Sequence, residues 1–189
     1  TRVETVVPYF ERFIAAFPDV AALAAADRDR VLKLWEGLGY YSRAHNLQKA
    51  AKILISDYKG VFPKTATAIQ SLPGIGRYTA GAIASIAFGE RVPVLDGNVK
   101  RVFARLFAVE DSIDDTATMH DLWTAAGLLV PRADPGDFNQ ALMELGARVC
   151  APRRPQCGEC PLRALCEARA RDNTPPVPGG GGTITVSNV

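Results

Sequence analysis

Apolar residues recur every three or four positions along most of the chain, as they do on the buried face of an amphipathic helix. The first such stretch runs from Val3 to Phe17. Asp27 and Ser42 stand where helix-capping side chains are common, just ahead of the next two stretches. Only residues 91–95 indicate an extended segment, which is too short and isolated to form a sheet. We therefore expect an all-α protein, with helices over residues 3–17, 27–35, 42–60, 65–71, 77–88, 98–108, 116–129 and 137–148.

The last part of the chain has a different composition. Residues 173–178 are rich in proline, and residues 179–182 are an uninterrupted run of glycine, as in flexible linkers. We expect a folded core over residues 1–172, followed by a linker or tail over residues 173–189.

The overall composition indicates a globular protein without membrane spans. Of the 189 residues, 48% are hydrophobic and 22% are charged. The sequence has neither an apolar stretch that could cross a bilayer nor a secretion signal, so we expect a cytoplasmic protein that contacts no membrane. We also expect a monomer. The net charge of +2 is too small to indicate a nucleic-acid partner, although residues 146–172 carry six Arg against three acidic residues. That stretch is either a phosphate-facing patch or a solvated basic surface.

All four cysteines lie close together near the end of the predicted core. Their spacing is Cys150-x6-Cys157-x2-Cys160-x5-Cys166. Four thiolates complete the coordination of a [4Fe–4S] cluster, with one sulfur for each iron. Structural zinc sites usually pair their ligands as two short knuckles, which the six-residue gap does not match. We therefore expect these cysteines to bind a [4Fe–4S] cluster, and we regard unligated core cysteines as the weaker alternative.

A glycine-rich turn joins two of the predicted helices. It reads Leu72-Pro73-Gly74-Ile75-Gly76 and opens the helix that begins near Arg77. Gly74 and Gly76 allow backbone conformations and close approaches that a side chain would block. Free amides at the start of the following helix bind anions well, so the turn is either a grip for a DNA phosphate or an ordinary tight connection.

An aspartate stands at the start of the next predicted helix. By local rules Asp96 is an N-cap, and a capped carboxylate is held rigidly enough to serve catalysis as well. Asn98 either orients that carboxylate or an attacking water, or is a second capping donor. We expect Lys100, Arg101 and Arg105 on the same helix to contact phosphate or to carry surface charge.

Several of these strings occur together in a known family. The cysteine spacing and four segments resemble MutY-type adenine DNA glycosylases of the endonuclease III superfamily, over about residues 1–172; the segments are WEGLGYYSRA (residues 35–44), LPGIGRYTAG (72–81), LDGNVKRV (95–102) and FNQALMELG (138–146). The resemblance implies a helix-hairpin-helix DNA glycosylase fold. Its helical lobe would span residues 16–108, and its [4Fe–4S] lobe would combine residues 1–15 with residues 109–172.

The resemblance also implies roles for single residues. Asp96 would stabilise or capture the positively charged sugar, and Tyr40 would wedge into the base stack beside an extruded nucleotide. Tyr41 is expected in the core. Gln140 would either reach adenine or lie on the helix surface, and Tyr78 would either line the base pocket or be an ordinary packed tyrosine at the start of a helix.

Two further features follow from the family pattern. Lyase members carry a lysine where this chain has Tyr78, and tyrosine supplies no amine for a Schiff base, so we expect base removal without efficient strand cleavage. Leu72, Gly74, Gly76 and Arg77 of the turn, together with Arg153 and Arg154 between the cysteines, would contact the DNA backbone.

The implied reaction is hydrolysis of the bond between deoxyribose and an adenine mispaired with 8-oxoguanine or guanine in double-stranded DNA. The family's proton-donating glutamate would precede Thr1, and neither Glu4 nor Glu36 occupies the matching place. We therefore expect the chain as it stands to be partial, without the C-terminal domain that recognises 8-oxoguanine, and to show little glycosylase activity alone. In a bacterium it would associate with the nucleoid.

Three alternatives remain open on the sequence. A mismatch thymine glycosylase of the same superfamily also accommodates Tyr78. An endonuclease III-like pyrimidine glycosylase ranks lower because the lysine is missing. A non-catalytic module that only binds DNA would need the turn and the cysteines but not Asp96.

Overall fold

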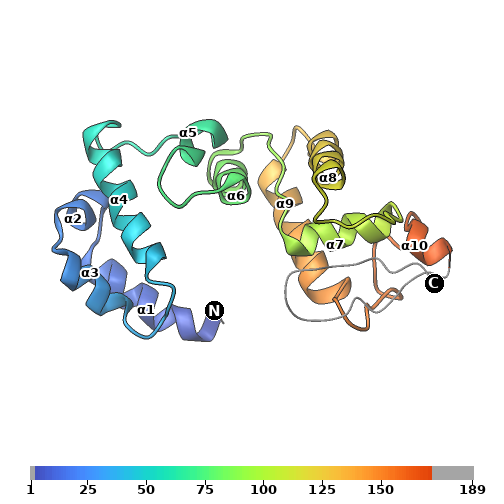
Figure 1. Ribbon diagram of the computed structural model, residues 1–189, viewed down its shortest axis with the longest axis horizontal. Coiled ribbons are helices and arrows are strands. Elements are labelled where there is room, and N and C mark those ends of the chain that lie inside the picture. The colour runs from blue at the N-terminus through green and yellow to red at the C-terminus, as the bar shows by residue number, and fades with distance from the viewer. Residues whose placement is uncertain (1–2, 172–189) are drawn as a thin grey trace. The chain divides into compact units, whose positions relative to one another are not determined.

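A computed structural model describes residues 3–171 as helices joined by short loops (Figure 1). The helices are α1 (Val3–Ala16), α2 (Val20–Ala25), α3 (Arg28–Trp35), α4 (Ser42–Ser56), α5 (Ala66–Gln70), α6 (Arg77–Phe88), α7 (Gly97–Leu106), α8 (Thr116–Leu129), α9 (Pro135–Glu144), the π-helical turn η1 (Leu145–Val149) and α10 (Glu167–Ala170). Residues 3–171 contain no strand, so the predicted all-α class is confirmed for them. No helix in this range is long and apolar enough to span a membrane.

Most predicted helices are present, with differences at their ends. Helices α6 and α8 have the predicted bounds, and Asp27 caps α3 as expected. The prediction that Ser42 caps a helix is wrong, because Ser42 is the first residue of α4 and Tyr41 occupies the cap position without a side-chain hydrogen bond. Helices α2 and α10 were not predicted, since six and four residues are too few to show a helical period.

The chain divides into two compact units, unit 1 (Thr1–Gly76) and unit 2 (Arg77–Val189). The lobes implied by the sequence group residues 1–15 with residues 109–172, and that grouping stays a prediction. The expected tail over residues 173–189 lies outside the described residues.

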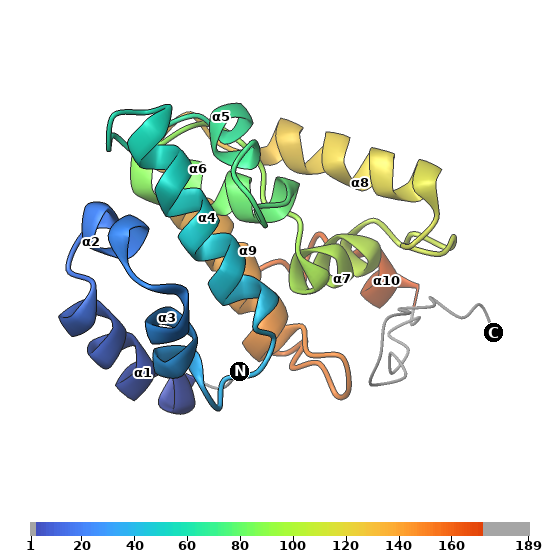
Figure 2. The ribbon, with the colours of Figure 1, turned by 60° about the vertical axis from the view of Figure 1, so that its left-hand side comes forward.

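Unit 1 is built around α4. Helix α3 lies between α1 and α4, and α2 packs against α4 (Figure 2). The core of this unit comprises Phe17, Leu23, Val31, Ala44 and Ala51, with the partly buried rings of Phe13 and Trp35 packed against it. The apolar pattern of α1 is only partly covered, because Val7, Phe10 and Ile14 remain exposed.

Unit 2 packs α7, α8 and α9 around an apolar core. This core comprises Leu95, Val99, Val102, Phe103, Ala104, Ile113, Leu122, Ala126 and Leu142. Helix α9 also lies directly against α6 (Figure 1). Gly136 makes this approach possible, because a Cβ placed on it would lie 2.7 Å from the carbonyl oxygen of Ser85 and 2.8 Å from the Cα of Ile86.

The Gly136 contact yields a stability prediction. Gly136→Ala is expected to destabilise the protein by about 1–3 kcal/mol, because the added methyl group meets backbone that cannot move aside easily. The control is Gly127→Ala on α8, where the nearest atom to an added Cβ is Pro93 Cγ at 4.0 Å. That variant is expected to be neutral or stabilising by up to ~1 kcal/mol. Urea unfolding would compare the two, and equal midpoints would contradict the proposed close approach.

Candidate functional site

Asp96 caps α7 through two backbone hydrogen bonds. Its Oδ1 accepts from the amide of Asn98 at 2.9 Å and from the amide of Val99 at 2.8 Å. The predicted N-cap is therefore confirmed. The other carboxylate oxygen, Oδ2, accepts from Nδ2 of Asn98 at 3.0 Å. Three hydrogen bonds thus hold this half-buried carboxylate in one orientation at the positive end of a helix.

Arg101 supports Asn98 from one turn further along α7. Its Nη2 donates to Oδ1 of Asn98 at 2.8 Å and to the carbonyl oxygen of Gly146 at 2.6 Å. Its Nε donates to the carbonyl oxygen of Cys150 at 2.8 Å. A continuous series of hydrogen bonds therefore runs from Cys150 through Arg101 and Asn98 to Asp96.

The surface role expected for Arg101 is wrong, because only 5% of the residue is exposed. Burial lowers the pKa of its guanidinium from the usual value, and the charge of Arg105 adds to that shift, whereas Cys150 and Asp96 oppose it. A buried guanidinium is tolerated when its donors have acceptors, and four backbone or side-chain oxygens meet that need here, those of Gly97, Asn98, Gly146 and Cys150.

Arg105 is likewise buried, with 4% of its surface exposed, so its expected surface role is also wrong. Its Nη1 donates to the carbonyl oxygen of Ala151 at 2.8 Å and contacts Sγ of Cys150 at 3.2 Å, while Nη2 donates to the carbonyl oxygen of Pro152 at 3.1 Å. Arg105 thereby fastens the start of the cysteine loop to α7. Arg153 and Arg154 follow directly and are exposed, as a phosphate contact requires.

The π-helical turn η1 brings the end of α9 against the start of α7. The amide of Cys150 donates to the carbonyl oxygen of Leu145 at 2.7 Å, five residues back, as in a π-helix. A Cβ on Gly146 would lie 2.6 Å from Cβ of Asn98 and 2.7 Å from its carbonyl oxygen. Only glycine fits at this crossing, which places the Gly146 carbonyl within reach of Arg101.

The four cysteines are half-buried and form no disulfide. Burial raises the pKa of the Cys157 thiol, and the thiolates of Cys150, Cys166 and Cys160 raise it further. Within residues 3–171, no three or more His, Cys, Asp or Glu side chains are grouped to hold a single ion. Four thiols match in number the ligand set of a [4Fe–4S] cluster, which takes one thiolate for each iron, and a guanidinium lies beside the first of them, Cys150.

Asn139 is a site residue that the sequence did not reveal. It is 1% exposed, and its Oδ1 accepts from the amide of Val94 at 3.3 Å. Its Nδ2 donates to the carbonyl oxygen of Val92 and to Oγ of Ser85, both at 2.9 Å. These bonds hold the irregular segment that leads into Asp96. The only signal in the sequence is a polar residue three positions before the buried Leu142, on the core-facing side of α9.

The residues of the glycine-rich turn fall into different environments. Leu72 is buried and packs with Ala50 and Leu54, so its side chain belongs to the core of unit 1 and any DNA contact there falls to the backbone. Gly74 has φ +78° and lies against Asn46, whereas a Cβ on Gly76 would meet nothing within 4 Å. Of the two glycines, Gly74 therefore has the positive φ and the close contact that exclude a side chain, whereas Gly76 has neither.

The helix that follows the turn belongs to unit 2. Arg77 is exposed, and its guanidinium lies 3.9 Å from the ring centroid of Trp123 on α8. Tyr78, in the first turn of α6, is exposed. Gln140 is also exposed and lies on the surface of α9, where its Nε2 approaches the carbonyl oxygen of Gly136 at 3.5 Å.

Tyr40 protrudes from the loop before α4. It is 79% exposed, and its φ of +48° is unusual for a residue with a side chain. The loop is pinned where Nε1 of Trp35 donates to the carbonyl oxygen of Gly39 at 3.0 Å. Tyr41, expected in the core, is 44% exposed, so that prediction is wrong. Strained backbone that presents an exposed aromatic ring is typical of functional loops.

Comparison with known proteins identifies the family to which the sequence is similar. The sequence matches the model of the HhH-GPD superfamily base excision DNA repair proteins over residues 1–127. It is 49% identical to the adenine DNA glycosylase of Mus musculus over 172 residues, which are 90% of this chain and 33% of that protein. The chain therefore spans about a third of the length of this mammalian relative.

Two solved structures resemble the fold over most of the chain. A thermostable thymine-DNA glycosylase matches with a TM-score of 0.79 at 31% identity, covering 88% of this chain and 76% of that one. A non-covalent endonuclease III–DNA complex matches with a TM-score of 0.74 at 26% identity, covering 89% of this chain and 78% of the other.

The buried Arg101 and its neighbour Lys100 form a matched pair for mutation. Arg101→Met is expected to lower the free energy of unfolding by about 3 kcal/mol or more, because it removes the donor that Arg101 supplies to Oδ1 of Asn98 and to the buried carbonyl oxygen of Gly146. Lys100→Met is expected to cost less than ~1 kcal/mol, since the ion pair that Lys100 makes within residues 3–171 is a long one, 4.0 Å from the exposed Asp114. Urea unfolding of both variants tests this difference, and similar losses would contradict the structural role of Arg101.

Proposed function

The chain belongs to the HhH-GPD superfamily of base excision DNA repair proteins, and we propose that it is the catalytic core of an adenine DNA glycosylase. Its reaction is hydrolysis of the N-glycosidic bond of an adenine mispaired with 8-oxoguanine or guanine in double-stranded DNA. The 49% identity to a mammalian adenine DNA glycosylase supports this assignment. The single structural observation that carries it is the Asp96 carboxylate, oriented by three hydrogen bonds at the start of α7.

The geometry of Asp96 suits the chemistry of base removal. Cleavage of an N-glycosidic bond passes through a state in which the sugar carries positive charge. A preorganised carboxylate stabilises that charge without having to reorient during the reaction. Asn98 is the positioning residue, because its amide holds Oδ2 of Asp96 while Arg101 holds the amide.

Tyr40 and Tyr78 are proposed to act on the extruded nucleotide. An exposed ring on a strained loop can enter the base stack and fill the space that the flipped base leaves. Tyr78 is proposed to line the base pocket, and because it has no amine the reaction ends at base removal without efficient strand cleavage. Gln140, exposed on α9, is proposed as a contact to the adenine.

The DNA backbone is proposed to be held at two places. Open space around Gly76 leaves room for a phosphate beside the start of α6, where Arg77 lies. Arg153 and Arg154 are exposed on the loop that Arg105 fastens, which suits a second backbone contact. The DNA complex of a structurally similar endonuclease III supports a duplex as the partner.

The four cysteines are proposed to bind a [4Fe–4S] cluster. When bound, the cluster supplies folding energy and a rigid loop rather than bond cleavage. The residues of this chain that would hold it are Cys150, Cys157, Cys160 and Cys166, and Arg105 anchors the loop that carries the first of them.

A mismatch thymine glycosylase is the second candidate, because a thymine-DNA glycosylase is among the structures that resemble the fold. Parallel assays on duplexes containing A:8-oxoguanine and T:G distinguish the two candidates. Release of adenine alone supports the first, whereas release of thymine alone supports the second.

Asp96→Asn tests the proposed reaction centre in the intact protein. Asparagine is as good an N-cap as aspartate but carries no charge, so stability and DNA affinity should change little. Adenine release under single-turnover conditions should fall by at least about 100-fold, as expected when a group that stabilises transition-state charge is lost.

The matched control for Asp96→Asn is Asp115→Asn. Asp115 caps α8 through the same pattern of two backbone amides, those of Ala117 and Thr118. Its substitution should leave adenine release unchanged. Release by Asp96→Asn at the rate of the control would overturn the assignment of Asp96.

The proposed cluster is tested by colour and metal content. The purified protein should be brown, absorb at roughly 400 nm and contain about four irons per chain. Cys160→Ala should lose this absorbance, whereas Arg153→Gln, an exposed neighbour in the same loop, should keep it. A colourless protein that contains zinc would refute the iron assignment.

A further inference from the structure

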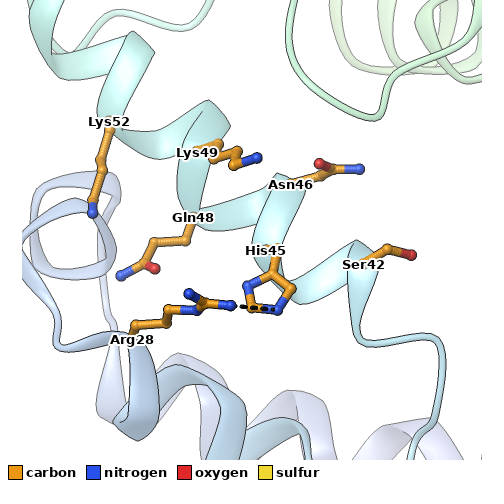
Figure 3. Close-up of a pocket in the computed structure, with 7 residues that line it drawn as sticks. All are labelled: Arg28, Ser42, His45, Asn46, Gln48, Lys49 and Lys52. Atoms are coloured by element: carbon orange, nitrogen blue, oxygen red, sulfur yellow. Dashed lines mark hydrogen bonds between the residues drawn. The ribbon is translucent and has the colours of Figure 1, made fainter.

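A cavity of about 410 Å³ lies in unit 1, outside the residues assigned to base removal. Its walls come from the first turn of α3 and the first three turns of α4; the lining residues are Arg28, Ser42, His45, Asn46, Gln48, Lys49 and Lys52. Figure 3 shows Arg28 reaching from α3 towards His45, with Gln48 and Lys52 extending from α4 on the same side of the view and Asn46 and Lys49 on the other.

The cavity has a strongly positive lining. Arg28, Lys49 and Lys52 each bring a positive charge, and none of the residues that line the cavity is acidic. A guanidinium Nη2 of Arg28 donates to Nε2 of His45 at 3.3 Å, which leaves its other donors available. Three like charges around one concave space repel one another, and an anion in that space relieves the repulsion.

The wall of the cavity is well ordered by hydrogen bonding. Gln48 is buried, and its Nε2 donates to the carbonyl oxygen of Ala26, which ties α4 to the connection between α2 and α3. The lysines are exposed, so their ammonium groups can meet a ligand that stays partly in solvent. This combination suits a phosphate on a larger molecule better than a small anion that needs full enclosure.

The position of the cavity within unit 1 indicates which phosphate it takes. Asn46, one of its lining residues, lies against Gly74 of the glycine-rich turn: a Cβ on Gly74 would be 2.6 Å from Nδ2 of Asn46. Tyr40 stands two residues before α4, the helix that supplies most of the wall. The cavity therefore adjoins the glycine-rich turn, which is proposed to grip DNA, and its main helix directly follows the loop that carries Tyr40.

We propose that this cavity binds a phosphodiester of the DNA backbone, through Lys49, Lys52 and Arg28, and so extends the contact made by the glycine-rich turn. The inference rests on the proposed function, since it takes DNA as the partner. Contacts of this kind fix the position of a protein on a duplex and add affinity without reading sequence.

The test is the salt dependence of DNA binding by the double variant Lys49→Gln/Lys52→Gln of the intact protein. Fluorescence anisotropy would give Kd for a matched duplex and for an A:8-oxoguanine duplex over a series of salt concentrations. Binding to both duplexes should weaken equally, by about tenfold at moderate salt, and the slope of log K against log salt should fall by about 1 to 2.

Lys33→Gln on α3 is the matched control, because Lys33 is exposed in the same unit but does not line the cavity. Lys49 and Lys52 are exposed, so their substitution should not disturb the core, and urea unfolding of the double variant verifies this. A slope and an affinity equal to those of Lys33→Gln would overturn the proposal. A thermal-shift titration with inorganic phosphate tests whether the cavity binds free phosphate instead of DNA. If phosphate raises the melting temperature of the wild type but not of the double variant, while both bind DNA equally well, the proposal is also overturned.

Failure of this proposal is distinguishable from failure of the proposed function. If adenine release depends on Asp96 but the double variant binds DNA as the control does, the cavity assignment alone is rejected. If the double variant shows the lower slope but the wild type releases no adenine, the glycosylase assignment alone is rejected.

Discussion

The buried guanidinium of Arg101 connects segments that are far apart in the sequence. It donates to the side chain of Asn98 within its own helix, to the carbonyl oxygen of Gly146 in the π-helical turn, and to the carbonyl oxygen of Cys150 where the cysteine loop begins. Because these oxygens lose the donor that Arg101 supplies when the segments separate, the guanidinium stabilises the arrangement in which the three segments meet. The orientation of Asp96 depends on it through Asn98.

Close backbone approach makes this arrangement possible. Gly146 lets the π-helical turn lie against Asn98, and Gly136 lets α9 lie against α6. From the same helix, Asn139 holds the irregular segment before Asp96 through its backbone amide and carbonyl groups. Helix α9 and its π-helical continuation therefore position the proposed catalytic carboxylate from two sides, although they contribute none of its direct hydrogen bonds.

In unit 1, the features proposed to contact DNA share one supporting element. Tyr40 precedes α4, Asn46 of α4 lies against Gly74, and Lys49 and Lys52 of the same helix line the basic cavity (Figure 3). Because the loop with the protruding ring leads directly into the helix that carries the cations, the two features lie close together along the chain. Such proximity is useful when a duplex must be held while one nucleotide leaves the stack.

The sequence by itself determined the features that depend on local chemistry: the all-α class, most of the helices, and Asp96 as a cap, because helical periodicity and capping act over a few residues. Arg101 and Arg105 recur four residues apart and so form a polar stripe, which is normally a solvent face. Only the tertiary structure covers that stripe with the cysteine loop, whose carbonyl oxygens turn two expected surface charges into buried anchors. The partners of Asn139 are likewise more than forty residues away in the sequence, so no local pattern reveals them. The exposure of Tyr41 also depends on how the chain packs and cannot be read from its neighbours in the sequence.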